Sequence, residues 1–83
     1  VCAGSGGDLV SDAVASGAEL FLTGELRHHD VLRAVDAGLT VMCTLHSASE
    51  RGALVALERR LSVELPGVTV TRSRADAEPL TFA

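Results

Sequence analysis

The chain has little aromatic surface and little positive charge. Its 83 residues contain no tryptophan, no tyrosine and only two phenylalanines, and the formal net charge is −4. Most nucleic-acid binding needs a basic surface and, for single strands, aromatic side chains on which bases stack. We therefore expect no direct contact with nucleic acid.

Long apolar runs and cysteines are also scarce. No run approaches the roughly 20 apolar residues of a membrane-spanning helix, and no stretch resembles a signal peptide. The two cysteines, Cys2 and Cys43, are too few for a disulfide framework. We expect no membrane contact and a reducing compartment, the cytoplasm, with a mitochondrial or nuclear pool left open.

The chain is short, and its first residues look like the end of a strand. Residues 1–3 (VCA) are apolar, and the chain opens on Val1 rather than on methionine. A chain of this length buries only about 60–65% of its unfolded surface, so it is marginal by itself. We expect residues 1–83 to be the single C-terminal α/β portion of a larger two-part α/β protein, with the N-terminal half absent.

Two hydrophobic periods alternate along the chain. Helical spacing predicts helices over 8–16, 26–37 and 47–64, the last ending before a Pro-Gly pair. Apolar runs predict strands over 1–3, 19–24 and 39–44, and alternation predicts an edge strand over 68–71 before an extended tail that ends in EPLTFA. Alternating strand-helix units predict an α/β fold with a mainly parallel or mixed sheet flanked by helices.

A polar motif follows each of the first three predicted strands. GSGG follows the first, TGE the second and TLHSASE the third. Ligands of parallel α/β sheets bind outside the carboxyl ends of the strands, so these motifs are the candidates for a functional site.

His46 and Glu50 are the most specific pair on physical grounds. They are four residues apart and therefore lie within about 40° of each other around a helix. Such a pair suits half of a divalent-cation site, or alternatively a helix start that Glu50 stabilises and His46 caps. We expect the pair to face inward, in line with a buried apolar stripe made of Ala53, Leu54, Leu57 and Leu61.

The LTGELRHHD motif holds three more polar candidates. Glu25, His28 and His29 fit one helix face, but adjacent histidines diverge by about 100° and do not easily chelate one ion. A histidine here could orient a ligand, transfer a proton or bind a metal-bound carboxylate, or the motif could be a solvated helix start.

Two further features have weaker signals. Gly4, Ser5, Gly6 and Gly7 could offer backbone amides to a phosphate, although a tight strand-to-helix turn explains the same residues. The arginines of the third predicted helix, Arg51, Arg59 and Arg60, are expected mostly to face solvent.

The motifs CAGSGG, TGELRHHD and LHSASERG, in this order and spacing, resemble the C-terminal part of the NIF-three-like family, whose members are also described as GTP cyclohydrolase I type 2 homologues. The resemblance runs almost end to end, to the tail DAEPLTF. It implies an α/β protein that assembles into a ring-shaped homo-oligomer, a hexamer, with two divalent metal ions in a cleft between its halves.

The resemblance also implies residue roles. His46 and Glu50 would be metal ligands, and the remaining ligands, a His-His pair and an Asp, would come from the absent N-terminal half. Glu25 and His29 would line the cleft as acid-base candidates or as groups that bind a ligand residue. Leu45 departs from the Gly or Glu of many members and should alter access to the site. The metals could be Zn, Mn, Fe, Co or Mg.

Two functions remain open at this point. Two cations roughly 3.5–4 Å apart suit hydrolysis of a nucleotide or phosphoester, and the family name implies opening of the GTP purine ring. The alternative is a metal-containing regulatory module that binds a protein partner, because the family is also linked to transcriptional co-regulation.

Overall fold

The structure, a computed structural model, describes residues 1–81 of the chain. Phe82 and Ala83, the end of the expected tail, lie outside the described residues. The chain divides into two compact units, a first unit from Val1 to Glu50 and a second unit from Arg51 to Ala83.

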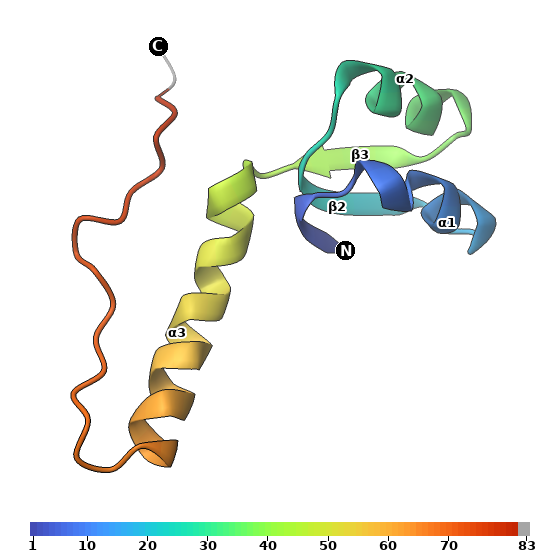
Figure 1. Cartoon of the computed structure of the whole chain (residues 1–83). Coiled ribbons are helices and arrows are strands. Elements are labelled where there is room, and N and C mark those ends of the chain that lie inside the picture. Colours follow the sequence, from blue (N-terminus) through green and yellow to red (C-terminus); the bar gives the residue numbers. More distant parts are fainter. Residues whose placement is uncertain (82–83) are drawn as a thin grey trace. The chain divides into compact units, whose positions relative to one another are not determined.

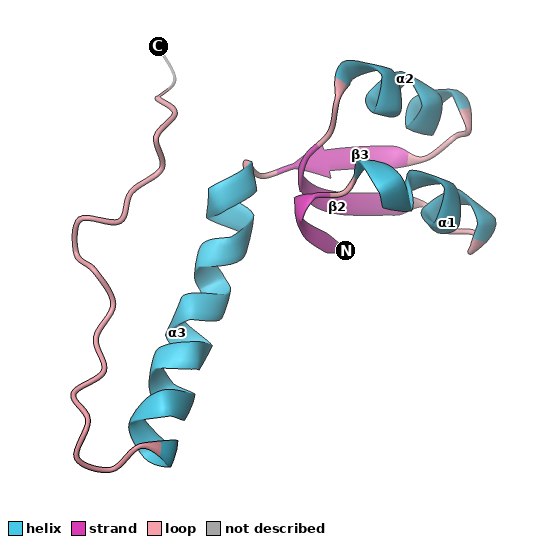
Figure 2. Ribbon diagram, in the orientation of Figure 1, coloured by secondary structure: helices cyan, strands magenta, loops and turns pink. Residues whose placement is uncertain are grey.

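The first unit is a three-stranded parallel sheet with connecting helices. Strands β1 (Cys2–Ser5), β2 (Leu20–Glu25) and β3 (Thr40–Cys43) lie in the order β1-β2-β3 (Figure 1). A short 3-10 helix η1 (Gly7–Leu9) and helix α1 (Val10–Ala15) connect β1 to β2, and α2 (His28–Asp36) connects β2 to β3 (Figure 2). Helix α3 (His46–Glu64) begins in this unit. The predicted parallel α/β fold is confirmed.

One face of the sheet carries the core. Its buried members are Val10, Phe21, Ala34 and Leu39, which come from α1, β2, α2 and the residue before β3. Side chains alternate between the faces of a sheet, so Leu20 points to the side opposite Phe21, where it is 51% exposed. Helices α1 and α2 therefore both pack on the Phe21 face, as consecutive right-handed crossovers require.

Helices α1 and α2 end in the same way. The residues after their caps, Gly17 and Gly38, have φ angles of 73° and 83°, which glycine adopts without the cost of a Cβ. The amides of Ala18 and Leu39 then bond back to carbonyls in the last helical turn, which completes a Schellman motif at each end. The motif after α2 places Leu39 in the core.

Strand β1 contains a bulge. Cys2 pairs with Thr23 and Ser5 pairs with Glu25, so three residue steps on β1 face two on β2. The additional residue leaves Gly4 at φ 69°. The expectation that this strand ends at residue 3 is wrong, because the bulge lets pairing resume at Ser5. The first half of GSGG is therefore strand rather than turn.

The second unit contains most of α3 and the C-terminal segment (residues 65–81). The predicted buried stripe on α3 is wrong: the helix has no buried residue, and Leu54 and Leu57 are 41% and 49% exposed. Within this unit the element that lies against α3 is a single extended segment rather than a sheet, so the apolar face is only partly covered.

The predicted edge strand over 68–71 is also wrong. Residues 68–71 are extended but belong to no sheet. Next to this stretch, the Arg72 amide donates to the Glu58 carboxylate at 3.4 Å instead of to a neighbouring strand. The alternating side chains predicted a strand. A strand also needs the backbone of a neighbouring strand as its hydrogen-bonding partner, and the side chains of α3 do not provide one.

Arginine-carboxylate pairs attach the C-terminal segment to α3. The Arg51 guanidinium donates to both oxygens of Asp76, at 2.9 and 3.2 Å, and to Glu78 at 3.0 Å. Arg72 donates to Glu58 at 2.7 Å. The hydrogen bonds from Arg51 lower the pKa of Asp76 below its usual value, and those from Arg72 lower the pKa of Glu58. Arg51 was expected to face solvent, and these contacts occupy its guanidinium instead.

Acid should release the C-terminal segment. A carboxyl whose pKa is lowered by folding contributes stability above its unfolded pKa, about 4, and that contribution is lost as the pH falls through the folded value. We expect Asp76 to titrate at higher pH in Arg51→Gln than in the wild type, measured by carbon-13 NMR of its carboxyl. A pKa of Asp76 in Arg51→Gln equal to that in the wild type would contradict the attachment. Arg59→Gln, which changes another arginine of the same helix, serves as the control.

Candidate functional site

Three of the predicted site residues come together in the first unit. Glu25 is the last residue of β2, His46 is the first residue of α3, and Glu50 lies one turn further along the helix. The His46 imidazole lies between the two carboxylates. Its Nδ1 is 2.9 Å from Oε1 of Glu25, and its Nε2 is 3.5 Å from Oε1 of Glu50.

The contact with Glu25 determines which nitrogen of His46 carries hydrogen. A carboxylate accepts hydrogen bonds but does not donate them, so Nδ1–H is the donor in the 2.9 Å contact. In the neutral ring the lone pair of Nε2 then lies on the Glu50 side. Metal-binding histidines usually donate their other ring N–H to a carboxylate, a carbonyl or water in this manner. The contact with Glu25 is therefore of the kind that orients a ligand histidine, and it is equally that of a histidine paired with two carboxylates.

The pair does not face a buried interior. The side chains of His46 and Glu50 are 46% and 53% exposed, so the expectation that they point inward is wrong. That expectation followed the apolar stripe of α3, and the stripe itself is not buried. Their direction is set instead by where α3 begins, just beyond the end of β3.

Gly4 forms the floor beneath the pair. A Cβ at Gly4 would lie 2.7 Å from Oε1 of Glu50 and 3.2 Å from Nε2 of His46. The two potential ligand atoms thus converge over a residue without a side chain. Its lack of a Cβ is what allows both atoms to approach the backbone of β1 this closely.

The donor set fits a divalent metal but does not complete its coordination. An imidazole nitrogen and a carboxylate oxygen on adjacent helical turns are common ligands of zinc and related cations. Among residues 1–81, no group of three or more His, Cys, Asp or Glu side chains is arranged to hold a metal ion. The described chain therefore offers two ligands of a shell that needs about four or more.

His29 lies elsewhere on the first unit. Its Nε2 is 3.6 Å from Oδ1 of Asp30, and its side chain is 70% exposed. Asp30 is largely buried and accepts a 3.0 Å hydrogen bond from Arg33. Like His28, which is exposed, His29 lies on α2, and its ion pair joins it to Asp30. An acid-base role for His29 stays a prediction.

The backbone amides of GSGG are partly occupied. The Gly4 amide donates to Oγ of Ser49 at 2.8 Å, and the Gly6 amide donates to the carbonyl of Glu25 at 3.3 Å. A phosphate bound here would depend mainly on the amides of Ser5 and Gly7. Phosphate binding by this motif stays a prediction, and it now involves two backbone amides rather than the four that the sequence analysis considered.

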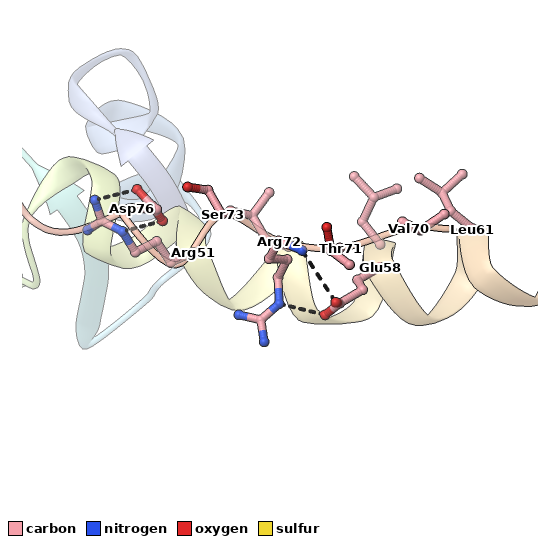
Figure 3. Close-up of a pocket in the computed structure, with 10 residues that line it drawn as sticks. Arg51, Glu58, Leu61, Val70, Thr71, Arg72, Ser73 and Asp76 are labelled. Atoms are coloured by element: carbon pink, nitrogen blue, oxygen red, sulfur yellow. Dashed lines mark hydrogen bonds and ion pairs between the residues drawn. The ribbon is translucent and has the colours of Figure 1, made fainter. Parts of the chain in front are cut away.

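The second unit carries an open groove between α3 and the C-terminal segment (Figure 3). Its apolar wall consists of Leu54, Leu57, Leu61 and Val70. The charged residues along it pair with each other, Arg51 with Asp76 and Arg72 with Glu58, as the dashed lines in Figure 3 show. The residues that line it in the described chain include no histidine or cysteine. The groups suited to metal chemistry therefore lie in the first unit.

Two further residues shape the site: Ser49, which the sequence analysis did not single out, and Leu45, whose backbone angle it did not predict. Ser49 bonds to Gly4, and Leu45, just before His46, has a φ of 71°. A non-glycine residue in this region costs about 1–2 kcal/mol. The serine within LHSASE was a visible signal, since a hydroxyl three residues after a candidate ligand can bond back to its carbonyl. Nothing in the sequence signals the φ of Leu45.

The chain is similar to proteins of one known family. Residues 1–79 match the family Duf34/NIF3 (NGG1p interacting factor 3). The chain is 42% identical over 81 residues to the rat protein called NIF3-like protein 1, and the match covers 96% of this chain and 21% of that protein. It is 39% identical over 83 residues to the NGG1-interacting factor 3 of Saccharomyces cerevisiae, covering 100% of this chain and 28% of that protein.

A solved structure has the same fold. The crystal structure of a Bacillus cereus protein related to NIF3 superposes with a TM-score of 0.77 at 21% identity, covering 98% of this chain and 23% of that one. The chain thus spans less than a third of the length of each of these relatives.

Replacement of Gly4 should disturb the His46–Glu50 pair beyond the cost of its backbone angle. Gly4→Ala places a methyl group 2.7 Å from the Glu50 carboxylate, whereas Gly17→Ala, at φ 73°, meets nothing within 4 Å. We expect both Gly17→Ala and Gly4→Ala to lower the free energy of unfolding by about 1–2 kcal/mol, and Gly4→Ala also to move the exposed ends of Glu50 and His46 away from position 4. Urea unfolding measures the losses, and side chains of His46 and Glu50 that keep their positions in a structure of Gly4→Ala would show that the floor is not tight.

Proposed function

Because the chain belongs to the Duf34/NIF3 family, we propose that it supplies two ligands, His46 and Glu50, to a divalent-metal centre of a hydrolase that acts on a nucleotide or phosphoester. The observation that supports the proposal most is the orientation of His46. Its Nδ1 is bound to Glu25 at 2.9 Å while its Nε2 lies beside Glu50, over a floor that has no side chain.

Each candidate site residue of the first unit has a defined part in this proposal. His46 and Glu50 bind metal, and Glu25 holds the imidazole in the orientation that directs Nε2 to the site. The remaining ligands come from outside the described residues, as a His-His pair and an Asp do in the resembling family. When bound, two divalent cations supply water activation and stabilise the charge that develops on the phosphoryl oxygens. His29 is retained as an acid-base candidate and the Ser5 and Gly7 amides as phosphate donors.

The donor chemistry is compatible with hydrolysis. Imidazole and carboxylate ligands bind divalent cations that can act as Lewis acids, and the exposed position of the pair gives a polar substrate access. The assembly that accompanies this site in the proposal is a ring-shaped homo-oligomer, a hexamer. None of the helices of residues 1–81 combines the length and apolarity needed to cross a membrane.

A regulatory protein-interaction module is the second candidate. It is favoured by the name of the yeast relative, NGG1-interacting factor 3. The two candidates differ in their dependence on metal. Turnover of nucleotides or phosphoesters that requires added Mn, Co, Zn or Fe favours the enzyme, whereas partner binding that is indifferent to a chelator favours the module.

Loss of either proposed ligand should lower the metal content. We expect His46→Ala and Glu50→Ala to reduce the metal bound per protein molecule from about two ions to one or fewer. Each variant removes a ligand that no nearby side chain of the described residues can replace. Elemental analysis of the full-length protein that contains this chain, purified without chelator, measures this. His28→Ala and Glu64→Ala, which alter exposed residues of the same types, should keep the wild-type content. Wild-type metal in both ligand variants, with folding retained, would overturn the proposal.

Loss of the Glu25 carboxylate should weaken the centre without abolishing it. Glu25→Ala removes the acceptor of the His46 Nδ1–H, so the ring can rotate and change tautomer. Removal of such a partner typically lowers metal affinity by about 10- to 100-fold. Titration with Zn²⁺ against a competing chelator measures the change. An affinity equal to that of the wild type would show that Glu25 does not orient the histidine.

A further inference from the structure

The Ser49 hydroxyl joins β1 to the first turn of α3. Its Oγ accepts a hydrogen bond from the Gly4 amide at 2.8 Å and donates one to the His46 carbonyl at 2.6 Å. The Ser49 amide also bonds to the carbonyl of Leu45 at 3.0 Å, the first backbone hydrogen bond of the helix. One side chain therefore connects the sheet, the helix start and the backbone of His46.

The bulge in β1 makes this connection possible. In a regular parallel strand the Gly4 amide could donate to the neighbouring strand. Here the register shifts between Cys2 and Ser5, Gly4 has a positive φ, and its amide donates to Ser49 instead. The approach is close. A Cβ on Gly24 would lie 2.5 Å from both the Gly4 carbonyl oxygen and Oγ of Ser49. Only glycine at position 24 lets the three elements meet at this distance.

The consequence is that His46 is held at both ends. Ser49 fixes its backbone through the carbonyl, and Glu25 fixes its ring through Nδ1. Glu50 follows Ser49 directly, so the same contact sets the position of the second carboxylate over Gly4. The hydrogen bonds of Ser49 go to Gly4, Leu45 and His46, so it acts through its neighbours.

We propose that Ser49 is a positioning residue of the His46–Glu50 half-site, which uses the Gly4 amide on the β1 bulge to hold both ligand residues in register with the sheet. This inference rests on the proposed metal centre and adds a residue to it. The ligand class is a divalent cation with nitrogen and oxygen ligands, and Co²⁺ is the probe because its visible absorption reports coordination geometry.

The test compares Ser49→Ala with the wild type, each in the full-length protein that contains this chain. We expect the affinity for Co²⁺ to fall about ten-fold, in the range for groups that orient metal ligands, and the visible spectrum of bound Co²⁺ to change. Ser49→Thr keeps the hydroxyl and should restore most of the affinity. If Ser49→Ala does not fold, Ser49→Val takes its place with the same expectation, because valine has the shape of threonine without its hydroxyl.

Two controls separate positioning from stability. Ser62→Ala removes a hydroxyl from the same helix, one that bonds to the Glu58 carbonyl at 2.8 Å, and should leave Co²⁺ binding unchanged. Gly17→Ala lowers stability through its backbone angle in open space and should also leave Co²⁺ binding unchanged. A Co²⁺ affinity and spectrum in Ser49→Ala equal to those of the wild type would overturn the inference.

The same titrations distinguish the inference from the proposed function. If His46→Ala and Glu50→Ala abolish Co²⁺ binding while Ser49→Ala binds as the wild type does, the metal centre stands and the role of Ser49 is wrong. If His46→Ala and Glu50→Ala bind Co²⁺ as the wild type does, both proposals fail together.

Discussion

The bulge at Gly4 is the constraint on which the candidate site depends. It places a left-handed glycine near the carboxyl end of β1 and directs the amide of this glycine to Ser49 on α3. The absence of a side chain leaves the space in which His46 and Glu50 converge. A single local irregularity thus attaches a helix to a sheet and also clears the floor between two potential ligands. Bulges near functional sites commonly redirect groups in this way.

The first unit joins a conventional scaffold to a strained edge. The Schellman motifs after α1 and α2 and the core around Phe21 follow ordinary rules and hold the strands in place. The strain lies at the carboxyl ends, where Leu45 has a φ of 71°, whereas Gly4 adopts its φ of 69° without strain. Such angles persist only when surrounding contacts determine them, and here the hydrogen bonds of Ser49 reach both segments.

Several features could be read from the sequence because they depend on local chemistry. Periodicity predicted the helices and the three paired strands, and motif order placed Glu25, His46 and Glu50 at one edge of the sheet. Other predictions failed where the outcome depended on a partner. The alternation of residues 68–71 could not reveal that no strand lies beside them, and the apolar stripe of α3 could not reveal that only an extended segment covers it in the second unit.

The sequence by itself determined the α/β class, the likeness to the Duf34/NIF3 family and the identity of the candidate ligands, because these follow from residue order and spacing. Only the tertiary structure decided that Nδ1 of His46 faces Glu25, that Ser49 bonds to Gly4, and that the Arg51 guanidinium binds Asp76. These contacts join residues 21, 45 and 25 positions apart. Their geometry depends on a bulge and on backbone angles that no spacing rule specifies.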